Sequence, residues 1–483
     1  MNDSAVRIDT FGVVTLRRPA ALARCLTSYI VNAARHGRTL RCVVCDDAAA
    51  PQDRAACRDV ARATAKVYGC AVQYIGLEEK LIVLRELIRT RDVPPDVVPF
   101  AFFDVERVGA SDGGNRNVLL LETCAAPILM ADDDTICMTR RPLGYRDAAS
   151  ARQTDEGERW DPSDVWMLGV GGDERDACRA ESLDFFGEHE RWLGRSIDAA
   201  STIRVTTNGT VGDCGWGSPS PFLFLRGSSL ARLTASNDRY DDYTTSRRVV
   251  RAASRVTIAA RTDDFMSGCF AVDARTMLPP FPPVGRGADR VFASLVAKCC
   301  ARARWAHLPI VLPHRPHQPR TFWRGEITRS AAGIDLCTLL CALLDVIPPP
   351  AYASDAERLA WYGTHLEEIA SPSTQAFEAA AVDAVRRTLA WQIDALEGAL
   401  ASRAARATQF RRDVRAYLAA LRRTSARADL HVPLDLRGDW PAEEARAVIQ
   451  RIVRRFGQLL THWPRLLHLR REMLHDSHVL AGR

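Results

Sequence analysis

The chain has 483 residues, of which 47% are hydrophobic and 26% are charged. This composition excludes a fibrous or wholly disordered protein, and the length is sufficient for two or three domains. The formal net charge is only +6. The sequence therefore lacks the strong basic bias of most nucleic-acid-binding proteins, and we expect no nucleic-acid partner.

Membrane and export signals are not evident in the sequence. No stretch reaches the roughly 18–20 apolar residues needed to cross a bilayer, and the first residues lack an apolar signal-peptide core. We therefore expect a cytoplasmic protein without a transmembrane segment, in which the 14 cysteines are free. Cys42 and Cys45 form a Cys-x-x-Cys pair, but an expected strand there directs the two thiols to opposite faces.

The first third of the chain alternates between strand and helix patterns. Strands are expected at 11–16, 40–45, 71–75 and 128–131, and helices at 19–35, 52–68, 78–90 and 115–124. This alternation predicts an α/β fold, a mostly parallel and doubly wound sheet with helices on both faces.

The middle of the chain is less regular. The stretch from about 140 to 262 is rich in Gly, Asp, Trp and Arg, with strand-like pieces at 165–170 and 222–225. We interpret it as an acceptor-side insertion of loops with parts of the same sheet. A strand at 267–273, a helix at 289–300 and a strand at 308–312 then complete a first domain, residues 1–333.

Residues 334–483 are expected to form an α-helical domain. Apolar residues from Val382 to Leu421 recur every three or four positions, which predicts one long helix or two joined end to end. A further helix is expected after Pro441, with a kink or split at Pro464. The long apolar stripe predicts a seam with another helix or another chain, and hence a homodimer.

Three adjacent carboxylates, Asp132, Asp133 and Asp134, follow the buried strand at 128–131 directly. Such groups repel one another unless water or a cation neutralises them. At the carboxyl end of a strand in an open α/β sheet they lie where such folds bind ligands. Hard divalent cations use a few carboxylates together with phosphate oxygens. The triplet alone leaves two alternatives open, a metal site and an acidic solvated loop.

Neighbouring residues favour an anionic ligand. Arg116 lies at an expected helix start, where free backbone N–H groups attract anions. Asp46 and Asp47 end the second strand on the same edge of the sheet as the triplet. A carboxylate there can accept hydrogen bonds from a base or a ribose, although an ordinary Asp turn has the same sequence.

The order of these motifs resembles the nucleotide-binding half of a GT-A glycosyltransferase, closest to the family-2 type. The resemblance covers residues 10–320 and rests on VVTLRRP, the strand ending in Asp-Asp, GGNRN and PILMADDDTIC. It implies a metal-dependent transferase with a nucleotide-sugar donor, most commonly a UDP-sugar. It also implies a set of donor-side residues: Thr15, Arg17, Asp47, Arg116, Asn117, Asp132 and Asp133.

The resemblance further implies a site for Mn²⁺ or Mg²⁺ on Asp132 and Asp134, with His314 as a further ligand. The cation would stabilise the departing nucleoside diphosphate. A histidine in an ordinary surface loop is the alternative for His314. The acceptor remains open, and glycans, lipids, peptides and natural products are all compatible.

Acceptor-side residues come from three further segments. Asp289 matches the catalytic base of inverting members, although Ala288 stands where they often have Glu, and the alternative is a carboxylate that stabilises a helix start. Asp263 and Asp264 begin a segment that resembles the acceptor side. Trp216, between two glycines, is either a sugar-stacking platform or a tryptophan that plugs the domain edge.

Two rival functions remain at this stage. A nucleotidyltransferase that forms NDP-sugars would share the fold, but its chemistry favours a glycine-rich phosphate loop after the first strand, where this chain has Leu16-Arg17-Arg18-Pro19. A non-enzymatic helical scaffold with a decayed GT-A domain is the second rival. The intact Asp triplet argues against decay, and Ala288 argues for it.

Overall fold

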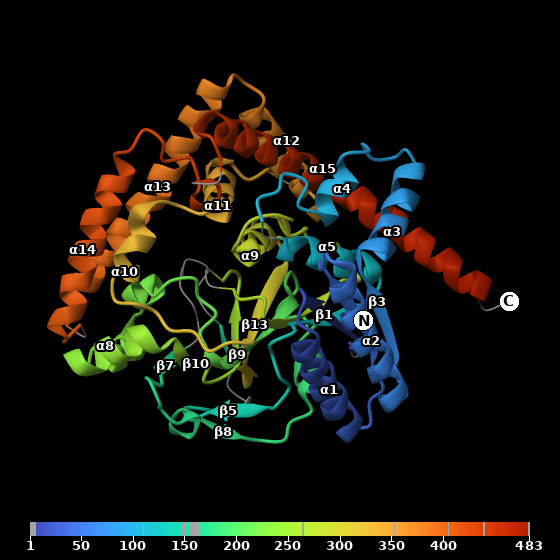
Figure 1. Cartoon of the computed structure of the whole chain (residues 1–483), viewed down its shortest axis with the longest axis horizontal. Helices are drawn as coiled ribbons and strands as arrows, with labels where there is room; N and C mark the ends of the chain where they lie inside the picture. Colours follow the sequence, from blue (N-terminus) through green and yellow to red (C-terminus); the bar gives the residue numbers. More distant parts are fainter. Residues whose placement is uncertain are drawn as a thin grey trace.

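The strands join one mixed sheet (Figure 1). The computed structural model describes residues 6–109, 111–146, 151–153, 164–262, 265–351, 353–403, 405–437 and 440–481. Within them, the sheet has the strand order β3-β2-β1-β4-β12-β9-β13-β11-β6. These strands are β1 (Thr10–Thr15), β2 (Arg41–Asp46), β3 (Ala71–Ile75), β4 (Pro127–Asp132), β6 (Arg152–Gln153), β9 (Thr202–Asp213), β11 (Thr257–Ala259), β12 (Cys269–Asp273) and β13 (Ala303–His314).

Shorter strands extend this sheet beside β9 and β13. β10 pairs with β9 and β7, and β5 pairs with β13 and β8. Their bounds are β5 (Arg140–Pro142), β7 (Asp164–Met167), β8 (Cys178–Ala180) and β10 (Arg248–Ala252). The expected α/β class with a mostly parallel sheet core is thus confirmed.

The first third folds as its pattern predicts. The helices are α1 (Pro19–Arg35), α2 (Pro51–Tyr68), α3 (Leu77–Arg89), α4 (Val97–Phe102) and α5 (Asp112–Glu122). Pro19 and Pro51 occupy first helical turns, where the missing N–H costs nothing. Leu22, Leu26 and Tyr29 form the buried face of α1, as the helical spacing requires.

Two apolar layers cover the two faces of the sheet. One contains side chains of α1 and α2, and the other contains side chains of α3, α4, α5 and the C-terminal helices. Cys42 lies in the first layer and Cys45 in the second, so the prediction of opposite faces is confirmed. All 14 cysteines are free.

The stretch at 140–262 is more than an insertion. Its strand β9 lies between β12 and β13 at the centre of the sheet, so this stretch contributes to the sheet itself. The strand expected at 222–225 is wrong, because Ser220–Phe224 forms a short 3-10 helix. The helices of this part and the next are α6 (Phe185–Glu190), α7 (Gly227–Leu233), α8 (Asn237–Ser246) and α9 (Ala288–Cys299).

Beyond Gly333 the elements are helical, as expected. α10 (Glu326–Arg329) precedes this point, and the helices beyond it are α11 (Leu336–Val346), α12 (Asp355–Ala370), α13 (Thr374–Ala401), α14 (Thr408–Ser425) and α15 (Ala442–Ala481). The apolar stripe therefore belongs to two helices, α13 and α14. The expected split at Pro464 is wrong, since α15 continues through this residue.

The C-terminal helices pack on the α/β part instead of standing apart (Figure 1). α15 contacts α3, α4 and α5. The buried Trp463 Nε1 donates to the Leu278 carbonyl at 2.7 Å, and Arg470 forms a 2.6 Å ion pair with the buried Glu122. One apolar cluster spans both parts. The stripe behind the dimer prediction is thus covered within the chain and gives no reason to expect a partner.

No single helix of the described residues is long and apolar enough to cross a membrane. The bent pair Glu326–Ala332 and Leu336–Val346 reaches the required length and apolarity. Most apolar side chains of the second helix, however, are buried in the core.

Candidate functional site

Strand directions bring the chemistry-bearing residues to one edge of the sheet. β1, β2 and β4 are parallel, β12 runs antiparallel to β4 and to β9, and β13 runs parallel to β9. The carboxyl ends of β1, β2, β4, β9 and β13 therefore share an edge, where β12 begins. Open α/β sheets bind ligands at this edge.

The middle carboxylate of the Asp triplet faces inward. The side chain of Asp133 is 0% exposed and accepts a 2.5 Å hydrogen bond from Thr15 Oγ1. Arg18 lies 3.0 Å from its other oxygen. Burial raises the pKa of Asp133 to about 7, although Arg18 and Thr15 act in the opposite direction. Asp133 and Thr15 thus anchor the triplet to β1, and their polar groups are already engaged with each other.

The outer two carboxylates are more accessible. The side chain of Asp132 is 31% exposed, and its Oδ1 forms a 2.6 Å ion pair with Arg116. Asp134 accepts from Arg18 at 3.1 Å on Oδ2. Burial alone would raise the pKa of Asp134, but His314 and Arg18 more than offset this and hold it at about 2. Asp132 and Asp134 are therefore the two members of the triplet that can meet a ligand.

His314 ends β13 beside Asp134. Its Nε2 lies 3.4 Å from Asp134 Oδ1, and its Nδ1 lies 2.8 Å from the carbonyl oxygen of Asp213. A carbonyl oxygen can only accept, so Nδ1 carries the proton that it donates to Asp213. In neutral His314, the Nε2 lone pair then faces a carboxylate oxygen. Asp134 Oδ1 is buried, and His314 is its ion-pair partner.

The lone pair of a neutral His314 Nε2 and the Asp134 Oδ1 atom would repel each other, so a proton on the imidazole or a cation between the two atoms is needed to stabilise the pair. Protonation of His314 is one way, and its pKa is indeed raised: burial would lower it, but Asp134 outweighs this effect. A divalent cation held by the carboxylate and the imidazole is the other. Asp134 and His314 thus bring two donor atoms within 3.4 Å of each other, whereas Asp132 Oδ1 is paired with Arg116.

The described residues contain no group of three or more His, Cys, Asp or Glu side chains arranged to hold a metal ion. This agrees with a cation that arrives with phosphate groups, because Mg²⁺ typically takes one or two protein carboxylates and completes its shell with phosphate oxygens and water.

Ser267 connects the triplet to Asp289. Arg116 donates from Nη2 to the Ser267 carbonyl at 3.4 Å as well as to Asp132. The Ser267 N–H points to Asp289 Oδ2 at 3.4 Å, and Asp289 Oδ1 accepts from the Arg290 N–H at 3.0 Å. Asp289, at the first turn of α9, thus lies at the same edge as Asp132. The guanidinium of Arg290 turns away and pairs with Asp335 at 2.6 Å.

The turn after β1 presents Arg18 to the site instead of Arg17. Arg17 is exposed and adopts a left-handed backbone with φ of 56°. Arg18 bridges Asp133 and Asp134. The sequence resemblance selected Arg17. Arg18 could be found only from the structure, because its partners Asp133 and Asp134 lie 115 and 116 positions farther along the chain.

Asp47 is held by a buried lysine. Lys80 Nζ is in close contact with Asp47 Oδ1 and lies 2.6 Å from Asn115 Oδ1, while Ser111 donates to Asp47 Oδ2 at 2.7 Å. Sequence reasoning missed Lys80, whose position on the buried face of an amphipathic helix is its only local signal. The pair can position Asp47 at the edge while one lone pair on each oxygen stays free.

Asn117 and Trp216 have structural partners. The Asn117 amide is fully buried and bonds to the carbonyls of Ala101 and Phe281. Trp216 is 7% exposed and packs edge-to-face on Phe222 at 4.9 Å, so its ring is not an open platform for a sugar. The predicted acceptor-side residues Asp263 and Asp264 lie outside the described residues.

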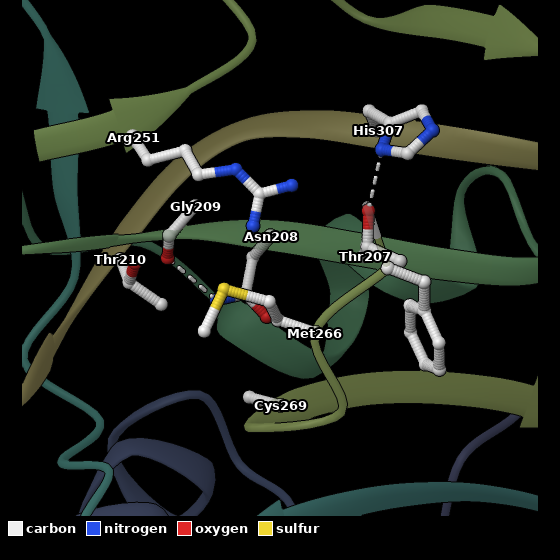
Figure 2. A pocket seen from close by; sticks show the side chains of 9 residues that line it. Thr207, Asn208, Gly209, Thr210, Arg251, Met266, Cys269 and His307 are labelled. Atoms are coloured by element: carbon white, nitrogen blue, oxygen red, sulfur yellow. Dashed lines mark hydrogen bonds between the residues drawn. The ribbon is translucent and has the colours of Figure 1, made fainter. Parts of the chain in front are cut away.

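A small cavity lies behind the site, between β9, β12 and β13. Figure 2 shows its lining, with Thr207 hydrogen-bonded to His307 and Met266 projecting toward Asn208 and Gly209. Its volume is about 20 Å³, which is room for one water molecule. It is too small for a sugar or a nucleotide, so the open edge of the sheet remains the candidate site.

Comparisons with known proteins identify no relative. No protein-family description matches the chain, and no curated protein is significantly similar to it. The site must therefore be interpreted from its own chemistry.

Proposed function

We propose that the protein is a metal-dependent glycosyltransferase that uses a nucleotide-sugar, most simply a UDP-sugar, with inversion at the sugar carbon. One observation supports the proposal most directly. Asp134 Oδ1 is buried and pairs with His314 Nε2 at 3.4 Å at the ligand edge of the sheet. This pair is suited to a cation that accompanies a diphosphate.

Asp132, Asp134 and His314 are the residues that would hold Mn²⁺ or Mg²⁺, which supplies Lewis-acid stabilisation of a departing diphosphate. Arg116 adds a positive charge of the chain itself beside the proposed cation site. Its ion pair with Asp132 fixes its guanidinium at this edge of the sheet. A guanidinium can stabilise negative charge that develops on phosphate oxygens.

Asp289 is the proposed base. In the displacement, an acceptor hydroxyl oxygen forms a bond to the sugar carbon while the bond to the diphosphate oxygen breaks. The hydroxyl proton passes to an Asp289 carboxylate oxygen. The N–H groups of Ser267 and Arg290 orient this carboxylate. Its position across Ser267 from Asp132 separates the proton acceptor from the carboxylates of the leaving-group side.

The proposal is tested first by the binding of UDP and Mn²⁺, and then by turnover. Thermal unfolding is measured with UDP, with Mn²⁺ and with both, for the native chain and for Asp134→Ala. With UDP at 100 times its Kd in the presence of Mn²⁺, binding should raise the free energy of unfolding of the native chain by about 2.7 kcal/mol. We expect this stabilisation to require both additives and to disappear in Asp134→Ala.

A matched control is Asp59→Ala, since Asp59 is exposed on α2 and lies 3.8 Å from Arg62 only. This variant should keep the full UDP and Mn²⁺ effect. UDP release from a panel of UDP-sugars then tests turnover. Equal stabilisation of Asp134→Ala and the native chain, or undiminished turnover in a chelator, would refute the metal-site assignment.

A further inference from the structure

A second, arginine-lined groove lies at the same edge of the sheet. It has a volume of about 510 Å³ and is lined by Arg140, Gly171, Gly172, Asp173, Glu174, Arg175 and Arg248. β10 begins at Arg248, which is opposite Asp213 at the end of β9. Met167 at the end of β7 is opposite Val249. The groove therefore opens where β7 ends and β10 begins, beside the carboxyl end of β9.

A glycine-rich turn shapes one wall. Gly169 and Gly171 have φ of +68° and +80°, a region that favours glycine. At Gly172 a Cβ atom would lie 1.5 Å from the Leu168 carbonyl oxygen, so no other residue fits this turn. The turn brings backbone groups, instead of side chains, to the wall between the arginines. Turns of this kind offer N–H groups to anions, and here the Val170 N–H already donates to the Asp242 carboxylate at 2.9 Å.

The charges of the groove are unbalanced in favour of cations. Glu174 pairs with Arg140 at 3.3 Å and with Arg315 at 2.8 Å, and Asp173 pairs with Arg175 at 2.6 Å. Three of the four arginines thus pair with these two carboxylates. Among the described residues, no carboxylate forms an ion pair with Arg248, although after Arg175 it also helps to lower the pKa of Asp173.

The groove is connected to the proposed metal site. Arg315 follows His314 directly, and its backbone N–H donates to the Asp134 carbonyl at 2.8 Å while its side chain pairs with Glu174. His314 therefore faces the proposed metal site, and the adjacent Arg315 faces the groove. A molecule with one end in the groove would place its other end near Asp134.

We propose that this groove binds a phosphate-type anion of the acceptor. The identification of the ligand as the acceptor depends on the proposed function, whereas the anion site itself does not. Arginine side chains from β5, β10 and the turn after β7 converge there, and their planar forks suit phosphate oxygens. The acceptor class is then a phosphate-bearing molecule whose hydroxyl reaches the Asp134 side of the edge.

The probe is inorganic phosphate in metal-free buffer with a chelator, and binding is followed by calorimetry and phosphorus NMR. We expect saturable binding that Arg248→Gln weakens roughly ten- to a hundredfold, the range for losing one hydrogen bond to a charged group. Arg239→Gln is the control, because it removes the same charge from an exposed position of α8 and should leave binding unchanged. Asp134→Ala should also retain phosphate binding.

Equal weakening by Arg248→Gln and Arg239→Gln, or no saturable binding, would overturn the anion site. Tighter binding of acetate than of phosphate would overturn its phosphate character. UDP binding with Mn²⁺ is then measured for Arg248→Gln. Unchanged UDP affinity assigns the groove to the acceptor, and a parallel loss assigns it to the donor and overturns the acceptor assignment. If UDP fails to bind the native chain while phosphate still binds the groove, the proposed function fails and the anion site stands.

Discussion

Acid should destabilise this protein through one buried histidine. His189 lies on α6 with 0% exposure, its Nδ1 is 2.7 Å from Thr206 Oγ1, and its ring packs on Phe185 at 4.7 Å. Its Nε2 is buried without a hydrogen-bond partner among the described residues. Burial lowers the pKa of His189 from 6.5 to about 3, because the imidazolium would lose its hydration without gaining a counter-charge.

The size of the effect follows from this pKa. The unfolded chain binds a proton at His189 below pH 6.5 and the folded chain does not, so stability is present above pH 6.5 and is lost as the pH falls. The full loss, reached near pH 3, is about 5 kcal/mol at 1.36 kcal/mol for each pKa unit. At pH 5.0 the loss is already about 2 kcal/mol.

The assay compares the native chain with His189→Gln, which can still reach the Thr206 hydroxyl but does not titrate. Free energies of unfolding are measured in urea at pH 7.5, 6.5, 5.5 and 5.0. All other groups titrate in both proteins, so their difference isolates His189. We expect His189→Gln to gain about 2 kcal/mol relative to the native chain between pH 7.5 and 5.0. A difference that stays constant with pH would refute the reasoning.

Two further predictions concern catalysis and the core. Asp289→Asn should lower single-turnover transfer by roughly 10²–10⁴ while calorimetric UDP affinity stays unchanged; equal losses in both, or a loss in neither, would make Asp289 a structural residue. Trp463→Ala should cost about 3–5 kcal/mol in one cooperative unfolding transition, because the indole is fully buried and bonds to Leu278 across the two parts of the chain. The half-exposed Trp391 provides the control, and a separate low-temperature transition after Trp463→Ala would contradict a shared core.

Local sequence patterns predicted the bounds of those elements whose conformation is determined by their own residues. α1 and β3 have the expected bounds, because Pro19 fixes a helix start and a short apolar run between turns fixes a strand. β9 was not predicted, although it is central. Its sequence, TIRVTTNGTVGD, is interrupted by Asn208, Gly209 and Gly212, which weaken a strand pattern, and its strand conformation depends on pairing with β12 and β13.

The residues of the candidate site also fall into those that the local sequence predicts and those that it does not. Asp132 and Asp134 could be expected at the ligand edge because they directly follow a buried strand. Arg18, Lys80 and Asp213 could not, because each acts through partners distant in the sequence. Contacts between distant parts of the chain also explain why α15 continues through Pro464. Packing against α3, α4, α5 and α12 stabilises this helix, and such packing can outweigh the loss of one helical hydrogen bond.

The meeting of His314 with Asp134 depends on an irregularity in β13. Leu308 is opposite Asn208 in β9, but Val311 is opposite the next residue, Gly209, so Pro309 and Ile310 are two extra residues on the β13 side. Beyond them His314 is opposite Gly212, and Thr135 bridges to His314. If the register at Leu308 continued without these two residues, His314 would lie two positions farther along, about 6.6 Å past its present level. An earlier shift of one residue in the opposite sense, between Arg304 and Trp305, leaves a net shift of one position along the whole pair. Two extra residues keep the alternation of faces but change the level of every later side chain. The run LPIVLPH predicts a strand, whereas its register with β9, and therefore the imidazole that faces Asp134, is determined by the paired strands together.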